Sequence, residues 1–166
     1  MSLLLPDFLF HRIYDIPPSF LQQHGITALV LDVDNTLTTH NNPVPRKRVR
    51  RWLQEMKTAG IKLTIVSNNN PDRVRPFAEL LQLDFVANGA KPLPKGILQA
   101  AGRMGVSPKQ LAVIGDQLFT DIAGAHTAGA TAVLVEPMEL ESMWFFKVKR
   151  ALERPFLRAY HRKAGK

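Results

Sequence analysis

Short apolar runs alternate with amphipathic stretches along most of the chain. The apolar runs contain many β-branched residues and predict buried strands at about 27–32, 61–66, 84–86, 111–115 and 131–135. The stretches between them have apolar residues at helical spacing and predict helices at about 45–59, 71–81, 95–104 and 119–128. Strands that alternate with helices are typical of parallel sheets. The sequence therefore predicts a three-layer, Rossmann-like α/β fold, with a central parallel sheet of about five strands and helices on both faces.

The two ends of the chain lie outside this alternation. A length of 166 residues favours one domain, which we place at 1–138, with residues 1–25 as an N-terminal extension that covers part of the sheet. Residues 139–166 form a separate basic, amphipathic helical segment. The chain has no cysteine, no basic start typical of a signal peptide and no apolar run of about 20 residues. We therefore expect a cytoplasmic protein, or one bound peripherally to the inner face of a membrane.

Polar residues follow four of the predicted strands. Because ligands of open α/β sheets lie beyond the carboxyl ends of the strands, these residues are candidates for one site. The candidates are Asp32 and Asp34 after the first strand, Ser67 and Asn68 after the second, Lys91 after the third, and Asp116 and Asp121 after the fourth. Such a set in chain order is hard to explain as turn and cap residues alone.

The residue types suit phosphoryl transfer. Asp32 could attack phosphorus and form an aspartyl-phosphate, and Asp34 could protonate the leaving oxygen and then deprotonate water. Asp32 and Asp116 offer the hard oxygen ligands that Mg²⁺ prefers. Lys91 supplies a positive charge for the phosphate, with Lys95 as a rival for this position.

The remaining candidates have supporting roles. Ser67 offers a hydroxyl donor, and the backbone N–H groups that follow it, from Asn68 onward, could help to bind an anion. Asp121 could orient Lys91 or the waters of the metal, or it could only stabilise the first turn of its helix. Thr36 is a further supporting candidate within the run 32–38.

These motifs resemble those of the haloacid dehalogenase (HAD) superfamily of phosphatases. The matching segments, in order, are Asp-Val-Asp-Asn-Thr-Leu-Thr at 32–38, Ser67, Lys91 in its Ala-Lys-Pro setting, and Gly-Asp-Gln-Leu-Phe-Thr-Asp at 115–121. The resemblance implies the roles given above and adds the backbone carbonyl of Asp34 as a magnesium ligand. Segments 67–70, 73–78 and 90–94 look like the YqeG-type group of subfamily IIIA. That group is similar to organellar phosphatases that convert phosphatidylglycerophosphate to phosphatidylglycerol, which suggests a lipid substrate.

The spacing of the motifs leaves no room for a cap domain. Only 33 positions separate Asp34 from Ser67, and 24 separate Ser67 from Lys91. One helix and one strand use most of each interval. An open site suits a phosphate on a large partner such as a lipid at a membrane, a protein or a nucleic-acid end, although another subunit could also cover it.

The C-terminal segment is strongly basic. The chain has a net charge of +8, and residues 147–166 contain eight basic residues against the single acid Glu153. Trp144, Val148, Ala151 and Leu152 form an apolar helical stripe, and Pro155 is expected to break or kink the helix. The segment either packs on the domain with its basic residues outward or lies on an anionic membrane surface.

Two other classes of protein remain as alternatives. A phospho-receiver module has a similar α/β build, but its acidic pair and its phospho-accepting aspartate lie on different strands, whereas Asp32 and Asp34 share one strand end. A nucleic-acid binder or 3′-phosphatase would use basic clusters such as Arg46–Arg51, with Trp52 stacking on a base. Nucleic acid is disfavoured as a partner, because the sequence has no recognised binding motif and no other aromatic platform.

Overall fold

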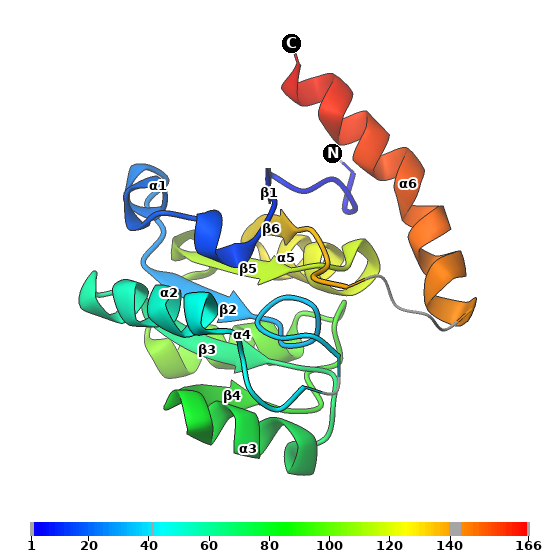
Figure 1. The fold of residues 1–166 in the computed structure, drawn as a ribbon. Helices are drawn as coiled ribbons and strands as arrows, with labels where there is room; N and C mark the ends of the chain where they lie inside the picture. The colour runs from blue at the N-terminus through cyan, green and yellow to red at the C-terminus, as the bar shows by residue number, and fades with distance from the viewer. Residues whose placement is uncertain (1, 41, 140–143, 166) are drawn as a thin grey trace.

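A parallel sheet forms the centre of the computed structural model, which describes residues 2–40, 42–139 and 144–165, with the backbone alone for 144–149 (Figure 1). The strands are ordered β1-β6-β5-β2-β3-β4, and every neighbouring pair is parallel. Their bounds are Phe8–Phe10 (β1), Ala28–Leu31 (β2), Lys62–Val66 (β3), Asp84–Val86 (β4), Leu111–Gly115 (β5) and Thr131–Val135 (β6). The predicted α/β class with a parallel sheet is confirmed.

The sheet has a sixth strand that the sequence pattern did not predict. β1 comes from the N-terminal extension and pairs with β6, with Phe8 opposite Val133. Asp7 strengthens this edge, because its backbone N–H donates to the carbonyl of Ala132 at 2.9 Å and its carboxylate accepts from the N–H of Ala132 at 2.8 Å. The extension therefore belongs to the sheet itself. A three-residue strand is too short to show a period in the sequence.

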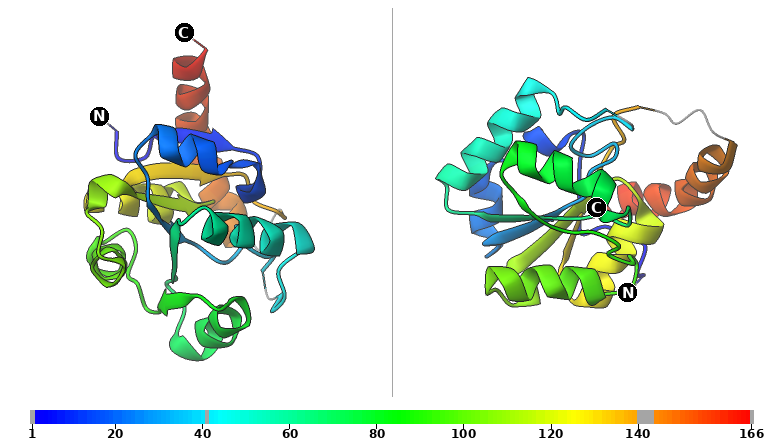
Figure 2. Two further views of the ribbon diagram at one scale, coloured as in Figure 1. Left: turned by 90° about the vertical axis from the view of Figure 1, so that its left-hand side faces the viewer. Right: turned by 90° about the horizontal axis from the view of Figure 1, so that it is seen from below.

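Helices cover both faces of the sheet (Figure 2). One face packs against α1 (Pro18–Gln23), α2 (Lys47–Thr58) and α3 (Pro71–Leu81), and the other against α4 (Lys95–Met104), α5 (Ala123–Ala128) and α6 (Trp144–Ala164). Side chains of a strand alternate between its two faces. In β2, Leu29 and Leu31 accordingly join the core beneath α2, and Ala28 and Val30 join the core beneath α4. Both faces of the central strand are buried, so its end is rigidly placed.

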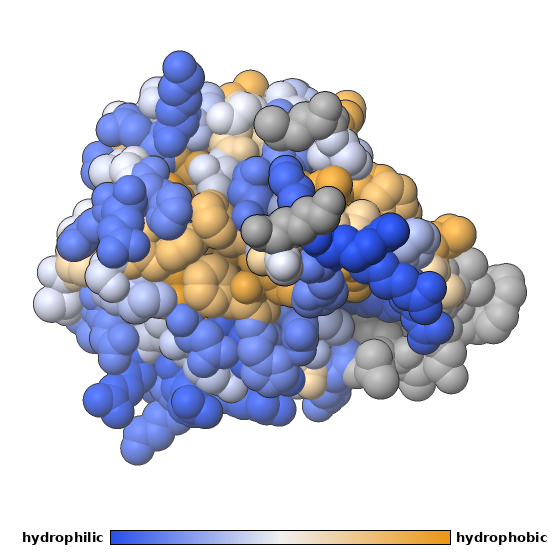
Figure 3. Space-filling view, turned by 90° about the horizontal axis from the view of Figure 1, so that it is seen from above, coloured by the Kyte–Doolittle hydropathy of each residue, from blue (hydrophilic) through white to orange (hydrophobic). Residues whose placement is uncertain are grey.

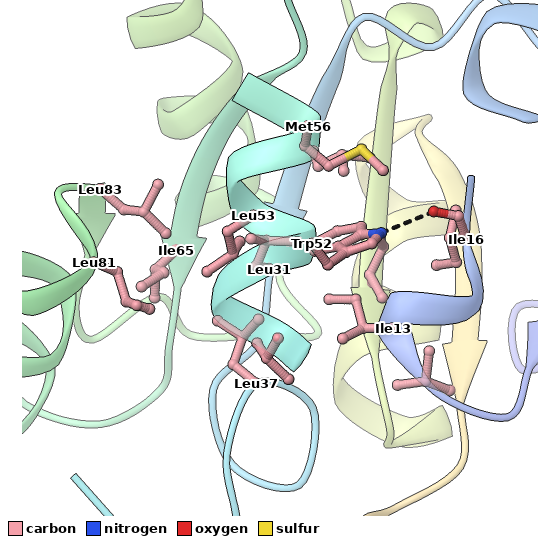
Figure 4. Close-up of a cluster of buried hydrophobic side chains, with 14 of the residues drawn as sticks. Ile13, Ile16, Leu31, Leu37, Trp52, Leu53, Met56, Ile65, Leu81 and Leu83 are labelled. Carbon is pink, nitrogen blue, oxygen red and sulfur yellow. Dashed lines mark hydrogen bonds between the residues drawn. The ribbon is translucent and has the colours of Figure 1, made fainter. Parts of the chain in front are cut away.

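Trp52 lies at the centre of the core beneath α2 (Figure 4). Its side chain is 2% exposed, and its indole N–H donates to the carbonyl oxygen of Ile16 at 2.8 Å. This contact joins α2 to the short 3₁₀ turn Ile13–Asp15 that precedes α1. A buried Trp52 cannot stack on a base, which removes the aromatic platform of the nucleic-acid interpretation.

Two C-terminal segments differ from the prediction. The helix expected at 119–128 begins as a π-helical turn, Leu118–Ile122, and continues as α5. Pro155 was expected to break or kink the last helix, and it does not break it, because Pro155 lies inside the continuous helix α6. The side chains on either side of it, Glu153 and Phe156, face the core and hold both halves of α6 in place. No helix within the described ranges combines the length and the hydropathy needed to cross a membrane.

Candidate active site

Three neighbouring strands bring the first site residues together. Asp32, Ser67 and Asp116 directly follow β2, β3 and β5, which are adjacent in the sheet. The hydrogen bonds between strands continue one residue beyond the strand ends. The N–H of Asp32 donates to the carbonyl oxygen of Ile114 at 3.0 Å, and the N–H of Ser67 donates to the carbonyl oxygen of Val86 at 3.0 Å. The backbone therefore fixes where these side chains start.

Lys91, rather than Lys95, reaches this edge of the sheet. Its ammonium group lies 3.0 Å from Asp32 Oδ1 and 2.6 Å from Asp121 Oδ1, and its side chain is 2% exposed. Burial alone would lower the pKa of Lys91, but the carboxylates of Asp121 and Asp32 outweigh burial and raise it above the usual value. Lys91 therefore carries a positive charge within the site. Lys95 is exposed at the start of α4.

Asn68 contacts the backbone of Lys91. Its side-chain oxygen accepts from the Lys91 N–H at 2.8 Å, and its amide nitrogen donates to the Lys91 carbonyl at 2.9 Å. These two bonds join the loops that follow β3 and β4. The side chain of Asn68 thus positions the backbone of Lys91, and phosphate binding through the backbone N–H groups from Asn68 onward stays a prediction.

Three carboxylates form a cluster beside Lys91. One oxygen from each of Asp32, Asp116 and Asp121 lies within 4.8 Å of the others. Burial, followed by the charge of Asp121, raises the pKa of Asp32 from 3.8 to about 7. Burial, followed by the charge of Asp32, also raises the pKa of Asp116 well above its usual value.

The cluster has the chemistry of a divalent cation site. Asp116 Oδ1 is buried and has no hydrogen-bond partner among the described residues. A buried oxygen without a partner is costly, and carboxylates held this close repel one another unless a cation lies among them. Oxygen-only ligands favour Mg²⁺ or a similar hard cation. The residues present therefore fit the predicted Mg²⁺, with the carboxylate of Asp121 as an additional member of the cluster.

Gly115 allows Asp121 to approach the end of β5. A Cβ atom at position 115 would lie 2.2 Å from Asp121 Cγ, a distance that no packing tolerates. The other oxygen of Asp121 accepts from the N–H of Gln117 at 3.2 Å, which fixes the carboxylate toward Lys91. Asp121 is therefore part of the buried charge network, beyond any effect on the first turn of its helix.

Asp34 lies to the side of this cluster. Its carboxylate accepts from Asn69 Nδ2 at 3.2 Å and from Arg73 Nη2 at 3.2 Å, and His40 Nδ1 is 3.7 Å away. Arg73 lies in the first turn of α3, which begins with Asn70 as its N-cap. The two aspartates of the Asp-Val-Asp motif thus have different environments, as two different chemical roles require.

A pocket of about 190 Å³ holds most of the predicted residues. It is lined by Asp32, Asp34, His40, Ser67, Asn68, Asn69, Lys91, Gln117 and Thr120. Ser67 is buried, and its hydroxyl oxygen accepts from the N–H of Asn69 at 3.1 Å. Thr36 does not line this pocket, and its hydroxyl is buried with no hydrogen-bond partner in the described structure.

Arg150 of α6 is a site residue that the sequence analysis missed. Its guanidinium group bonds Asp116 Oδ2, donates to the Asp116 carbonyl oxygen at 2.6 Å and lies 3.2 Å from Glu153 Oε2. Glu153 is 2% exposed and accepts from the N–H of Leu118 at 3.1 Å. The one signal in the sequence was Glu153 itself, the only acid among eight basic residues in 147–166.

Known proteins match this chain over most of its length. The family model for haloacid dehalogenase-like hydrolases matches residues 12–129. The probable phosphatase YqeG of Bacillus subtilis is 37% identical over 159 residues, which cover 96% of this chain and 92% of that protein. A glyceraldehyde 3-phosphate phosphatase of Methanopyrus kandleri is 28% identical over 148 residues, 82% of this chain and 60% of that protein.

A solved structure shares the fold. The cobalt-bound deoxy-D-mannose-octulosonate 8-phosphate phosphatase of Haemophilus influenzae superposes with a TM-score of 0.56 at 16% identity, covering 83% of this chain and 91% of that one. At this identity the likeness concerns the fold alone. The family model and the Bacillus relative, by contrast, cover the motif residues themselves, and they exclude a phospho-receiver module. The chain belongs to the haloacid dehalogenase-like hydrolases, and it is a phosphatase.

Proposed function

We propose that this protein is a Mg²⁺-dependent phosphomonoester hydrolase that works through an aspartyl-phosphate on Asp32. The observation that carries the proposal is the position of Asp32. It contacts the buried cation Lys91 at 3.0 Å and belongs to the same cluster as Asp116, whose Oδ1 has no partner among the described residues. The proposed nucleophile thus lies between a fixed positive charge and a candidate cation site.

The proposed reaction has two steps. An oxygen of Asp32 attacks the phosphorus atom, and the bond to the leaving oxygen breaks as Asp34 donates a proton to that oxygen. Asp34 then takes a proton from water, and the water oxygen attacks phosphorus and releases Asp32 together with inorganic phosphate. Lys91 and the Ser67 hydroxyl bind the equatorial phosphate oxygens, where charge accumulates in the transition state.

The cation would be held by Asp32, Asp116 and the backbone carbonyl of Asp34. It supplies positive charge that offsets the repulsion between a carboxylate nucleophile and a phosphate dianion. Asp121 lies 2.6 Å from Lys91 Nζ and holds that ammonium group beside Asp32.

We propose that the substrate phosphate is carried by a large or membrane-associated molecule such as phosphatidylglycerophosphate. The support is the openness of the site. Among the described residues, only α2 and β3 lie between Asp34 and Ser67, and only α3 and β4 between Ser67 and Lys91. Neither interval holds a domain that could enclose a small metabolite.

The described part of α6 has two unlike faces. Glu153, Phe156 and Leu157 face the core, whereas Arg154, Arg158 and Arg162, four residues apart, are exposed on another side. The strands point toward the side on which the first turns of α6 lie (Figure 1). Seen from the side of β1, hydrophobic residues form a band between hydrophilic ones (Figure 3). An exposed basic row on one side of a helix suits peripheral binding to an anionic membrane.

The function is tested by phosphate release. The wild type should release phosphate with Mg²⁺ and lose this activity with chelator or in Asp32→Asn. The panel compares phosphatidylglycerophosphate in mixed micelles with sugar phosphates, nucleotides and a 3′-phosphorylated oligonucleotide. Equal or better activity on the soluble compounds would contradict the lipid assignment, and release that persists in Asp32→Asn would contradict the mechanism.

Membrane binding is tested separately with vesicles of phosphatidylglycerol and phosphatidylcholine. Each basic residue near such a surface contributes about 1 kcal/mol, so Arg158→Glu/Arg162→Glu should weaken binding at least roughly 30-fold. The matched control, Lys47→Glu/Arg50→Glu, makes the same charge change at exposed positions of α2. Equal losses in both variants, or no loss in either, would show that α6 is not the membrane-binding element.

A further inference from the structure

A second and larger cavity adjoins the catalytic pocket. It has a volume of about 490 Å³, against about 190 Å³ for the catalytic pocket. Asp34, Ser67 and Asn69 line both. The two hollows therefore meet at the residue that we propose as the acid for the leaving oxygen. A volume of this size is within the range of small-molecule sites.

The walls of the larger cavity are mainly apolar. One wall comes from the loop after β2, including Val44, and the other from α3, including Val74, Phe77 and Leu80. Val44 is 48% exposed and Leu80 is 51% exposed, so two large apolar side chains lie open to solvent at this cavity. Asp34, Ser67 and Asn69 are polar residues at its junction with the catalytic pocket, and Arg73, which also lines the larger cavity, donates to Asp34.

The reaction fixes what can occupy this cavity. The nucleophile and the leaving oxygen lie in line on opposite sides of phosphorus, and the acid must reach the leaving oxygen. The alcohol attached to that oxygen therefore extends from Asp34 away from Asp32. The apolar cavity begins at Asp34, so this is the direction in which the alcohol continues.

We propose that this cavity is the leaving-group subsite, and that it selects phosphomonoesters whose alcohol carries a hydrocarbon portion close to the ester oxygen. The inference rests on the proposed phosphomonoester hydrolysis and adds a chemical class of alcohol. That class differs from phosphatidylglycerophosphate, in which a polar glycerol lies next to the ester oxygen and the hydrocarbon is distant. Burial of hydrocarbon against Val44, Phe77 and Leu80 supplies the selectivity, because each buried methylene is favourable by itself.

The test uses soluble n-alkyl phosphates from ethyl to hexyl phosphate, without micelles or vesicles. Full burial of one methylene corresponds to about a fourfold gain in kcat/KM. Because the cavity is open to solvent, we expect each methylene to contribute about half of the corresponding free energy, which is roughly a twofold gain in kcat/KM. Hexyl phosphate should then exceed ethyl phosphate roughly 16-fold. Leu80→Gln should flatten this dependence.

The matched control is Leu98→Gln, at a leucine of α4 that is 43% exposed and lines neither cavity. It should keep the wild-type dependence on chain length. As a readout without turnover, n-hexylphosphonate should bind the Mg²⁺-loaded wild type more tightly than methylphosphonate, by calorimetry, and Leu80→Gln should reduce that preference.

The outcomes separate the two proposals. No hydrolysis of any ester by the wild type would overturn the proposed function. Hydrolysis with no dependence on chain length would overturn the leaving-group subsite alone. A dependence that survives unchanged in Leu80→Gln would also overturn it, since the hydrocarbon would then bind elsewhere.

Discussion

Asp32→Asn should stabilise the metal-free protein at alkaline pH while it abolishes activity. The cause is the buried position of Asp32, whose pKa is raised from 3.8 to about 7 by burial and by Asp121. In the unfolded chain Asp32 ionises near its usual value. In the folded protein it keeps its proton until about pH 7. The folded state therefore binds the extra proton between these values, and the free energy of unfolding falls as the pH rises through this window.

The size of the effect follows from the two pKa values. The difference between 3.8 and about 7 corresponds to roughly 4 kcal/mol once the pH exceeds the folded value. The side chain of Asp32 is 15% exposed, which admits some screening by water, and Lys91 keeps its bond to Asp121 in the variant. We therefore expect a gain of ~2 kcal/mol at pH 8, or ~4–8 °C in Tm for a chain of this length.

The assay is thermal unfolding followed by circular dichroism between pH 4 and pH 9 in chelator. The gain from Asp32→Asn should vanish near pH 4 and reach its full size above pH 7. Asp84→Asn, at an exposed carboxylate, should change Tm little at any pH. Mg²⁺ should reduce the advantage of Asp32→Asn, because binding to the folded wild type stabilises it. A variant that is no more stable than wild type at pH 8, or a gain that is equal at pH 4 and pH 8, would refute the reasoning.

Two further predictions concern packing around the carboxylate cluster. Gly115→Ala should lower the free energy of unfolding by ~2 kcal/mol, because the added Cβ atom would collide with Asp121. Gly102→Ala in α4 is the control and should not lower it, because no atom lies within 4 Å of the added Cβ atom. Equal Tm values for the two variants would contradict this prediction. Arg150→Met should speed thermolysin cleavage of α6 by roughly 30-fold. The lost charge-assisted bonds to Asp116 are worth about 2 kcal/mol, so α6 should detach from the domain more often. Unchanged cleavage would show that Arg150 does not anchor the helix.

The sequence by itself determined the sheet class and the position of the site. Two aspartates directly after an apolar, β-branched run could only lie at a strand end, and parallel strands bring such ends together. The local sequence was sufficient to predict these elements, because the alternation of a strand, the apolar spacing of a helix and the residues that cap it all depend on neighbours within a few positions. The sequence also favoured Lys91 over Lys95, from its Ala-Lys-Pro setting, and it is Lys91 whose ammonium group lies beside Asp32.

Only the tertiary structure decided which distant segments meet. β1 became a strand because β6 offered it an open edge, and three residues carry no period of their own. Arg150 lies 34 positions after Asp116, in a segment whose charge pattern pointed to solvent or membrane. The apolar cavity beside Asp34 exists because α3 packs opposite the loop after β2. Such contacts depend on how elements stack in space, and hydrophobic spacing along the chain does not encode which face of one element meets which partner.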